Sequence, residues 1–220
     1  EVHEAIRRNF IRKPGGKWLY GPTEVPGDFR RSDRRASFQA NPFSYLVERA
    51  RFDEILIERS AACGADVRFR CEVNEVLIDH GRVVGVKYHD AAGRDTCLYA
   101  NLVIDASGLR SLIPSKFRLR QTAEPQRMGI YAQYVAGAKR DDLMDGWFVG
   151  QMFYDGWTWL MRLPEDRFSV GAVLTVDRFR RSRRTPEELL ECLVEENELL
   201  NGGMTTDRRR ISDVYVTGNM

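Results

Sequence analysis

The chain has 220 residues, of which 43% are hydrophobic and 30% are charged, so it has an ordinary globular composition and can bury a sizeable core. Its formal net charge of +2 is too small to indicate nucleic acid or an anionic membrane as a partner. No apolar run approaches the ~20 residues that a membrane span requires. The four dispersed cysteines form no CxxC pair, which favours buried free thiols in the cytoplasm and argues against a metal site.

Residues 1–62 predict short strands around one clear helix. We expect the end of a helix and a short strand within residues 1–11, followed by an ordered excursion over 13–41 that combines Gly, Pro and Arg with aromatic residues. An extended run at 45–47 precedes residues 49–62, whose apolar side chains recur at helical spacing. Gly64 then ends this helix as a left-handed cap.

Strands dominate the next segment. Alternating residues predict a strand at 67–71, and residues 73–88 predict a hairpin that turns at Asp79-His80-Gly81, with a third strand at 97–99. Residues 102–104 form a continuous apolar run, which is typical of a strand buried on both faces.

After residue 117 the pattern changes to a mostly antiparallel sheet. Thr185 as N-cap and Pro186 at the first position predict a helix that runs to about Leu200 and stops at Gly202-Gly203. A last strand is expected at 211–216. The four strands expected before the helix share aromatic and β-branched residues and lie at 130–135, 147–154, 157–163 and 168–175. A boundary near residue 120 therefore separates a mixed α/β part, 1–120, from an antiparallel part, 121–220.

The turn Asp105-Ala106-Ser107-Gly108 is the main functional signal that the residues themselves provide. Ligands of α/β sheets gather at the carboxyl ends of strands, and small residues there let a bulky cofactor approach the backbone. An ordinary strand-to-loop turn is the competing interpretation.

Three segments resemble flavoprotein monooxygenases and, within that superfamily, the flavin-dependent halogenases. They are Phe10 to Trp18 with its Lys-x-Gly, Arg49 to Leu56, and the Trp-x-Trp strand pair from Asp155 to Gly171. The resemblance covers nearly the whole chain. It implies a fragment of a three-layer α/β FAD-binding domain of the aromatic hydroxylase type over 1–120, and a substrate-binding antiparallel sheet with a helix over 121–220.

The resemblance also implies residue roles near the reacting groups. Lys13 matches the lysine that receives or steers hypohalous acid in halogenases, and Lys17 is the rival if the alignment slips by a few residues. Trp157 and Trp159 match aromatic residues on the substrate side. Because large aromatic residues also fill cores, a core role for both tryptophans is the alternative.

Other residues match the cofactor site of these enzymes. Arg49 matches an arginine that heads a helix and reaches the FAD pyrophosphate, where a guanidinium offers several fixed donors. A solvated arginine at the start of a helix is the alternative. The residues that match the turn near the flavin are Asp105, Ala106, Ser107, Gly108 and Arg110.

Some features depart from the family pattern. Met161-Arg162 stands where halogenases have Ile-Pro, and no GxGxxG opens the chain. We therefore expect an internal fragment that is inactive alone and does not hold FAD tightly.

The function implied for the intact protein is an FAD-dependent oxidation. A flavin hydroperoxide would oxygenate a small molecule or oxidise halide for transfer to an electron-rich ring, with electrons drawn from a separate flavin reductase as one arrangement. The alternatives are a flavin reductase similar to geranylgeranyl reductases, and a non-catalytic remnant that no longer binds FAD.

Overall fold

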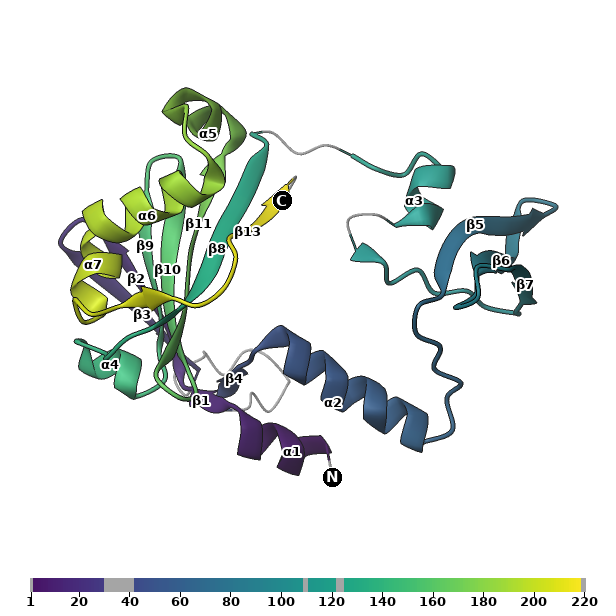
Figure 1. The fold of residues 1–220 in the computed structure, drawn as a ribbon, viewed down its shortest axis with the longest axis horizontal. Helices are drawn as coiled ribbons and strands as arrows, with labels where there is room; N and C mark the ends of the chain where they lie inside the picture. Colours follow the sequence, from purple (N-terminus) through teal and green to yellow (C-terminus); the bar gives the residue numbers. More distant parts are fainter. Residues whose placement is uncertain (1, 30–41, 109–110, 122–124, 219–220) are drawn as a thin grey trace. The chain divides into compact units, whose positions relative to one another are not determined.

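The computed structural model describes residues 2–29, 42–108, 111–121 and 125–218 (Figure 1). It divides into two compact units, Glu1–Glu58 with Glu124–Met220, and Arg59–Ala123, each of which is described by itself. Residues 1–58 thus group with the second half of the chain, whereas the predicted parts were 1–120 and 121–220. The assignment of FAD and substrate to those parts stays a prediction.

The first unit is built on a large mixed sheet in the order β12-β8-β11-β10-β9-β2-β3, with β13 also pairing with β8. All its pairs are antiparallel except that of β2 with β9, which is parallel. Its strands are β2 (Gly15–Tyr20), β3 (Thr23–Asp28), β8 (Arg127–Val135), β9 (Phe148–Phe153), β10 (Gly156–Leu163), β11 (Arg167–Thr175), β12 (Arg209–Arg210) and β13 (Tyr215–Gly218). The four predicted central strands are confirmed, and the described part of the excursion is the β2–β3 hairpin.

The core of this unit lies between the sheet and the helices that cover one of its faces (Figure 1). Leu160 of β10 and Leu190 and Leu200 of the covering helices are fully buried there. The helices are α4 (Asp141–Met144), α5 (Val176–Ser182), α6 (Pro186–Glu196) and α7 (Glu198–Gly203).

The predicted single helix after Thr185 is instead two helices. Thr185 is the N-cap of α6 and Pro186 lies in its first turn, as predicted, and Glu188 completes a reciprocal capping box with Thr185. The break comes at Asn197, whose side-chain oxygen accepts a hydrogen bond from the Leu200 N–H and so starts α7 afresh.

The predicted last strand at 211–216 is also wrong in its bounds. The Ser212 hydroxyl, rather than a backbone carbonyl, accepts the hydrogen bond of the Gln133 N–H. This interrupts the ladder, so β12 and β13 pair with β8 on either side of the interruption.

Near the beginning of the chain, α1 (Val2–Asn9) leads into β1 (Ile11–Lys13), which pairs with β4 (Ser44–Leu46). Helix α2 (Arg49–Ala62) has the predicted bounds. Gly64 ends it with φ +98°, and the Ala65 and Gly64 N–H groups bond back to the Ser60 and Ala61 carbonyls, as in a Schellman motif.

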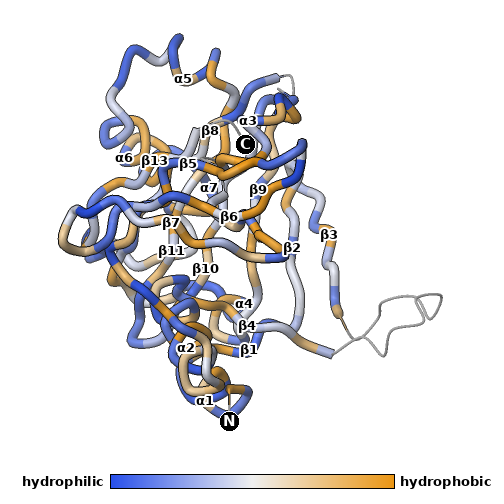
Figure 2. The backbone as a smooth tube through the Cα atoms, turned by 90° about the vertical axis from the view of Figure 1, so that its right-hand side faces the viewer, coloured by the Kyte–Doolittle hydropathy of each residue, from blue (hydrophilic) through white to orange (hydrophobic). Residues whose placement is uncertain are grey.

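The second unit is a three-stranded antiparallel sheet with a short helix. Strands β5 (Glu72–Asp79), β6 (Arg82–His89) and β7 (Asp95–Tyr99) follow in sequence, and α3 (Leu112–Lys116) comes after them. His80 and Gly81 both have positive φ, which fits the predicted tight hairpin turn. The apolar run in β6 is visible as an orange stretch of the tube in Figure 2.

Two strands predicted in this unit are absent from its described residues. Residues 67–71 and 102–104 pair with no strand, and Leu102 and Ile104 are 75% and 79% exposed rather than buried. A strand buried on both faces needs neighbours in the sheet and layers above and below it, and this unit supplies only the three-stranded sheet. The prediction of buried thiols is wrong for Cys63 and Cys97, which are exposed. Among the described residues, no helix combines the length and apolar character needed to cross a membrane.

Candidate active site

Lys13 ends strand β1 and lies opposite Ser44 of β4. Its Nζ lies 5.1 Å from the centroid of the Phe148 ring and 5.8 Å from that of Phe29. Burial lowers the pKa of the Lys13 amine below its ordinary value, because removal of water disfavours the charged form. Lys13 is half-buried, and within the described residues no carboxylate contributes to this pKa.

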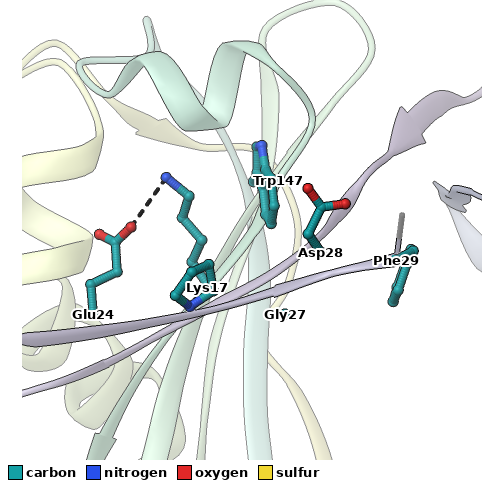
Figure 3. Close-up of a pocket in the computed structure, with 7 residues that line it drawn as sticks. Lys17, Glu24, Gly27, Asp28, Phe29 and Trp147 are labelled. Atoms are coloured by element: carbon teal, nitrogen blue, oxygen red, sulfur yellow. Dashed lines mark ion pairs between the residues drawn. The ribbon is translucent and has the colours of Figure 1, made fainter. Parts of the chain in front are cut away.

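Lys17, the rival candidate, is held by carboxylates instead. Its Nζ lies 3.2 Å from both Glu24 Oε1 and Asp142 Oδ2. Burial by itself would lower the pKa of Lys17, but the hydrogen bonds to Glu24 and Asp142 outweigh it and raise the pKa. Figure 3 shows Lys17 turned toward Glu24 beside Trp147. The cavity there measures about 610 Å³ and is lined by Lys17, Glu24, Pro26, Gly27, Asp28, Phe29 and Trp147.

The carboxylate of Asp142 is the centre of this charged cluster. It is only 9% exposed, and it accepts hydrogen bonds from Arg140 as well as the ion pair from Lys17. Burial alone would raise the pKa of Asp142, but these cations lower it overall. The stabilisation is therefore present above the unfolded-state pKa of about 4 and is lost as the pH falls through the lower folded-state pKa.

We expect Asp142→Asn to lower the free energy of unfolding by about 1–3 kcal/mol at pH 7, because the half-buried Lys17 and Arg140 lose a buried charged acceptor. The loss should shrink as the pH falls below about 4. Urea titrations of the full-length protein at both pH values measure it, with the exposed neighbour Asp141→Asn as the control. A loss of the same size at both pH values would contradict the assignment to charge.

Gly15 is the glycine of the Lys-x-Gly segment, and its position allows no side chain. A Cβ there would collide with the backbone oxygen of Gly27 across the β2–β3 hairpin and would lie 2.7 Å from the Trp147 ring. Gly16 has room by comparison, since its nearest Cβ contact is 3.5 Å away on Phe148. The absence of a side chain at Gly15 thus permits the close approach of β2 and β3.

Trp157 and Trp159 project from β10 away from the helices. Thr158 and Leu160, which alternate with them, are fully buried on the helix-covered face, and the Thr158 hydroxyl donates to Asn197. Both tryptophans are only half-buried on the opposite face. The interpretation of these residues as core is therefore wrong.

Contacts with its neighbours fix the orientation of the Trp159 ring. Its Nε1–H donates to Ser169 Oγ at 3.2 Å. The indole lies over Gly171, where a Cβ would collide with the ring and would lie 2.6 Å from Tyr131 Cβ. Tyr131 in turn stacks on Tyr215 at 5.2 Å between ring centroids. Trp159, Tyr131 and Tyr215 thus form a continuous row of aromatic rings.

The face of the large sheet opposite the helices is an aromatic face, which we define by Trp18, Tyr131, Phe148, Trp157, Trp159 and Tyr215. Cross-strand pairing places Trp18 and Trp159 on either side of Gly150, and the Trp18 and Phe148 rings are 5.3 Å apart. Since Phe148 also flanks the Lys13 amine, the structure brings Lys13, Trp157 and Trp159 to one side of the sheet. The sequence reasoning missed Phe148, Tyr131 and Tyr215, because strand register decides which aromatic residues share a face.

In the second unit, Asp105 organises the predicted cofactor turn. Its carboxylate accepts hydrogen bonds from the Ser107 hydroxyl, at 2.5 Å, from the Ser107 N–H and from the Ile113 N–H. These bonds, the one from the Ser107 side chain first, lower the pKa of Asp105. This carboxylate is thus committed to the turn and the start of α3.

The rest of the turn is open. Ala106, Ser107 and Gly108 are exposed, and Gly108 has φ +66° with nothing near its Cβ position. Arg110 lies outside the described residues. A cavity of about 540 Å³ adjoins the turn and is lined by Cys71, Glu72, Val73, Val76, Val86, Val103, Ile104, Asp105, Ala106, Ser107, Leu112 and Ile113. Small residues beside an apolar cavity fit a bulky planar cofactor.

Arg49 is the first residue of α2 and is exposed. Its guanidinium donates to Asp53 at 3.1 and 3.2 Å, an exposed ion pair within the helix that contributes little to stability. The guanidinium at a helix N-terminus is thus available to a phosphate. Arg51 is paired with Glu54. Arg49 lies in the first unit and the 105–108 turn lies in the second, so each is compared with the cofactor separately. Among the described residues, no cluster of His, Cys, Asp or Glu has the arrangement of a metal site.

Comparison with known proteins gives consistent matches. The family model described as tryptophan halogenase matches residues 28–211. Among curated proteins, digeranylgeranylglycerophospholipid reductase 2 of Methanopyrus kandleri is 31% identical over 89% of this chain and 44% of its own length. The 1H-pyrrole-2-carbonyl-[peptidyl-carrier protein] chlorinase of Pseudomonas fluorescens is 27% identical over 92% of this chain and 50% of its own.

Solved structures agree with the fold class. The myxobacterial chondrochloren halogenase CndH, a variant of FAD-dependent halogenases, superposes with a TM-score of 0.81 at 26% identity, over 99% of this chain and 50% of that one. The predicted α/β class is confirmed. The chain spans about half the length of the relatives it matches.

Proposed function

Because the chain belongs to the tryptophan halogenase family, we propose that the full-length protein is an FAD-dependent oxidoreductase that oxidises or halogenates an electron-rich small molecule. The observation that supports this most is the placement of Lys13. Its side chain is half-buried, has no carboxylate partner among the described residues, and lies at the edge of the aromatic face. An amine with a lowered pKa has a larger neutral fraction, which suits it to take up or steer an electrophilic oxidant.

The aromatic face supports binding of the substrate. The Trp159 ring is oriented by its hydrogen bond to Ser169 and by its packing over Gly171. Flat rings of this kind stack on planar groups and exclude water from them. We therefore assign Trp157 and Trp159 to the substrate side.

FAD, when bound, supplies the redox chemistry. We propose that Arg49 donates to its pyrophosphate and that Ala106, Ser107 and Gly108 let it approach the backbone, while Asp105 keeps that turn in shape. A cytoplasmic location and a separate flavin reductase as electron donor are parts of the same proposal.

The cofactor assignment is tested by titrating the full-length protein with FAD and following flavin absorption. We expect Arg49→Ala to weaken FAD binding about 10- to 100-fold, because it removes charge-assisted hydrogen bonds to phosphate. Arg51→Ala is the matched control, two residues along the same helix, and should leave the affinity unchanged. Equal affinity in both variants would remove Arg49 from the site, and no FAD binding by the parent would favour a non-catalytic remnant.

A reductase that saturates isoprenoid double bonds is the second candidate, and the 31% identity with the Methanopyrus kandleri reductase favours it. The two functions separate by assay. A reductase consumes reducing equivalents in step with loss of substrate double bonds and needs neither oxygen nor halide, whereas the proposed oxidation requires oxygen.

A further inference from the structure

Two phenyl rings from different strands flank the Lys13 amine. Phe148 begins β9 and Phe29 follows the end of β3. Phe148 is itself held in place, since its ring meets the Trp18 ring at 5.3 Å and its backbone pairs with Gly16 of β2. The Phe29 N–H donates a hydrogen bond to the carbonyl of Pro14, the residue that follows Lys13.

The charged groups on the surrounding elements have other partners. On β1 itself, the Arg12 guanidinium lies 4.6 Å over the Phe43 ring. On the β2–β3 hairpin, Lys17 is paired with Glu24, and Asp28 has an interaction of its own. On α4, Asp142 is taken up by Lys17 and Arg140; β4 places the uncharged Ser44 opposite Lys13. Among the described residues, the two rings are therefore the groups that meet the ammonium.

We propose that Phe148 and Phe29 are positioning residues, whose ring faces hold the ammonium of Lys13 in place and offset part of its lost hydration. The negative face of an aromatic ring attracts a cation within about 6 Å of its centroid, and more strongly where water is excluded. Both measured distances satisfy this limit. We call the space between the Phe148 and Phe29 rings, where the Lys13 amine lies, the slot. Its use in catalysis rests on the proposed function, whereas its geometry does not.

Two opposing effects act on the pKa of Lys13 in the slot. Burial lowers it, and attraction to the rings raises the pKa back toward its ordinary value. Leucine at position 148 keeps an apolar side chain over the amine and removes the ring. We therefore expect Phe148→Leu to lower the pKa of Lys13 further, by about 0.5 to 1.

The test is pH-dependent acetylation of the full-length, FAD-loaded protein by acetic anhydride, with the Lys13 peptide quantified by mass spectrometry. Phe148→Leu and Phe29→Leu should each shift the midpoint of Lys13 labelling downward. Phe148→Tyr, which keeps a ring, should retain the parent midpoint. The control is Phe153→Leu, on the same strand but packed on the helix-covered side, where its ring faces Arg178.

A midpoint in both slot variants equal to that of Phe153→Leu would overturn the proposal. So would an upward shift, which would show that the rings only exclude water. Flavin absorption and thermal melting report whether each variant is folded, and Phe29→Leu serves if Phe148→Leu is not.

The labelling needs no turnover, so its outcome is separate from that of the proposed function. In an active enzyme the pH midpoint of kcat should move with the labelling midpoint while KM stays constant. If Lys13→Ala keeps full activity but the labelling shifts occur, the slot stands and the catalytic role of Lys13 fails.

Discussion

Lys13→Ala is expected to lower product formation by the full-length enzyme about 10²- to 10⁴-fold, the range for loss of a positioned catalytic group. FAD reduction and oxygen uptake should continue, because Arg49 and the 105–108 turn are unchanged. The reason is the position of the amine. The half-buried Lys13 amine lies at the edge of the aromatic face, and partial burial lowers its pKa below the ordinary value. Product and oxygen consumption measured in the same reaction test this.

Two further lysine variants make this result specific. Lys17→Ala removes the rival, whose ammonium is committed to Glu24 and Asp142, and should affect stability more than product yield. Lys116→Ala removes an exposed lysine at the end of α3 and should change neither. Unchanged product formation in Lys13→Ala would end its catalytic role, and a loss confined to folded Lys17→Ala would transfer that role to Lys17.

Gly15→Ala should lower the free energy of unfolding by about 1–3 kcal/mol, the usual cost of forcing an added methyl group into a packed site. The new Cβ would meet the Gly27 backbone oxygen, which cannot move without opening the β2–β3 hairpin. Phe29 follows that hairpin, so the ring beside Lys13 should shift too, and activity should fall with stability.

Gly16→Ala is the matched control, because the same methyl group there has its nearest contact at 3.5 Å. Both variants replace glycine by alanine, so the change in intrinsic backbone preference and the loss of conformational freedom in the unfolded chain are the same. Urea titrations of the two full-length variants compare them directly. Equal stability of the two variants would show that the hairpin can relax around the new methyl group. The close approach of Gly27 would then not explain the glycine at position 15.

Elements set by local residues could be predicted from the sequence. The helix at 49–62 has a glycine cap at Gly64, and α6 has its N-cap at Thr185, because both signals act within one turn of the helix. The hairpin turn at His80-Gly81 was also predicted, and both residues have positive φ. Asn197 was missed because its cap restarts a helix inside a continuous apolar pattern.

The candidate site was predicted only in part. Lys13 and Lys17 lie in the same glycine-rich segment, and only the fold shows that the Lys13 amine lies over aromatic rings and that Lys17 is paired with carboxylates. Phe148 gave no signal, since nothing local indicates that it lies over an amine 135 positions earlier in the chain (148 − 13).

Local signals in the sequence were enough to predict the helix at 49–62, the helix start at Thr185 and the hairpin turn at Gly81, because capping and turn geometry act over a few residues. Tertiary structure decided strand order and register, and these decided the rest. Parallel pairing of β2 with β9 brought Phe148 to Lys13, and the register of β10 turned Trp157 and Trp159 away from the core. The apolar run at 102–104 shows the same dependence, since a strand is buried only where neighbouring strands and layers cover it.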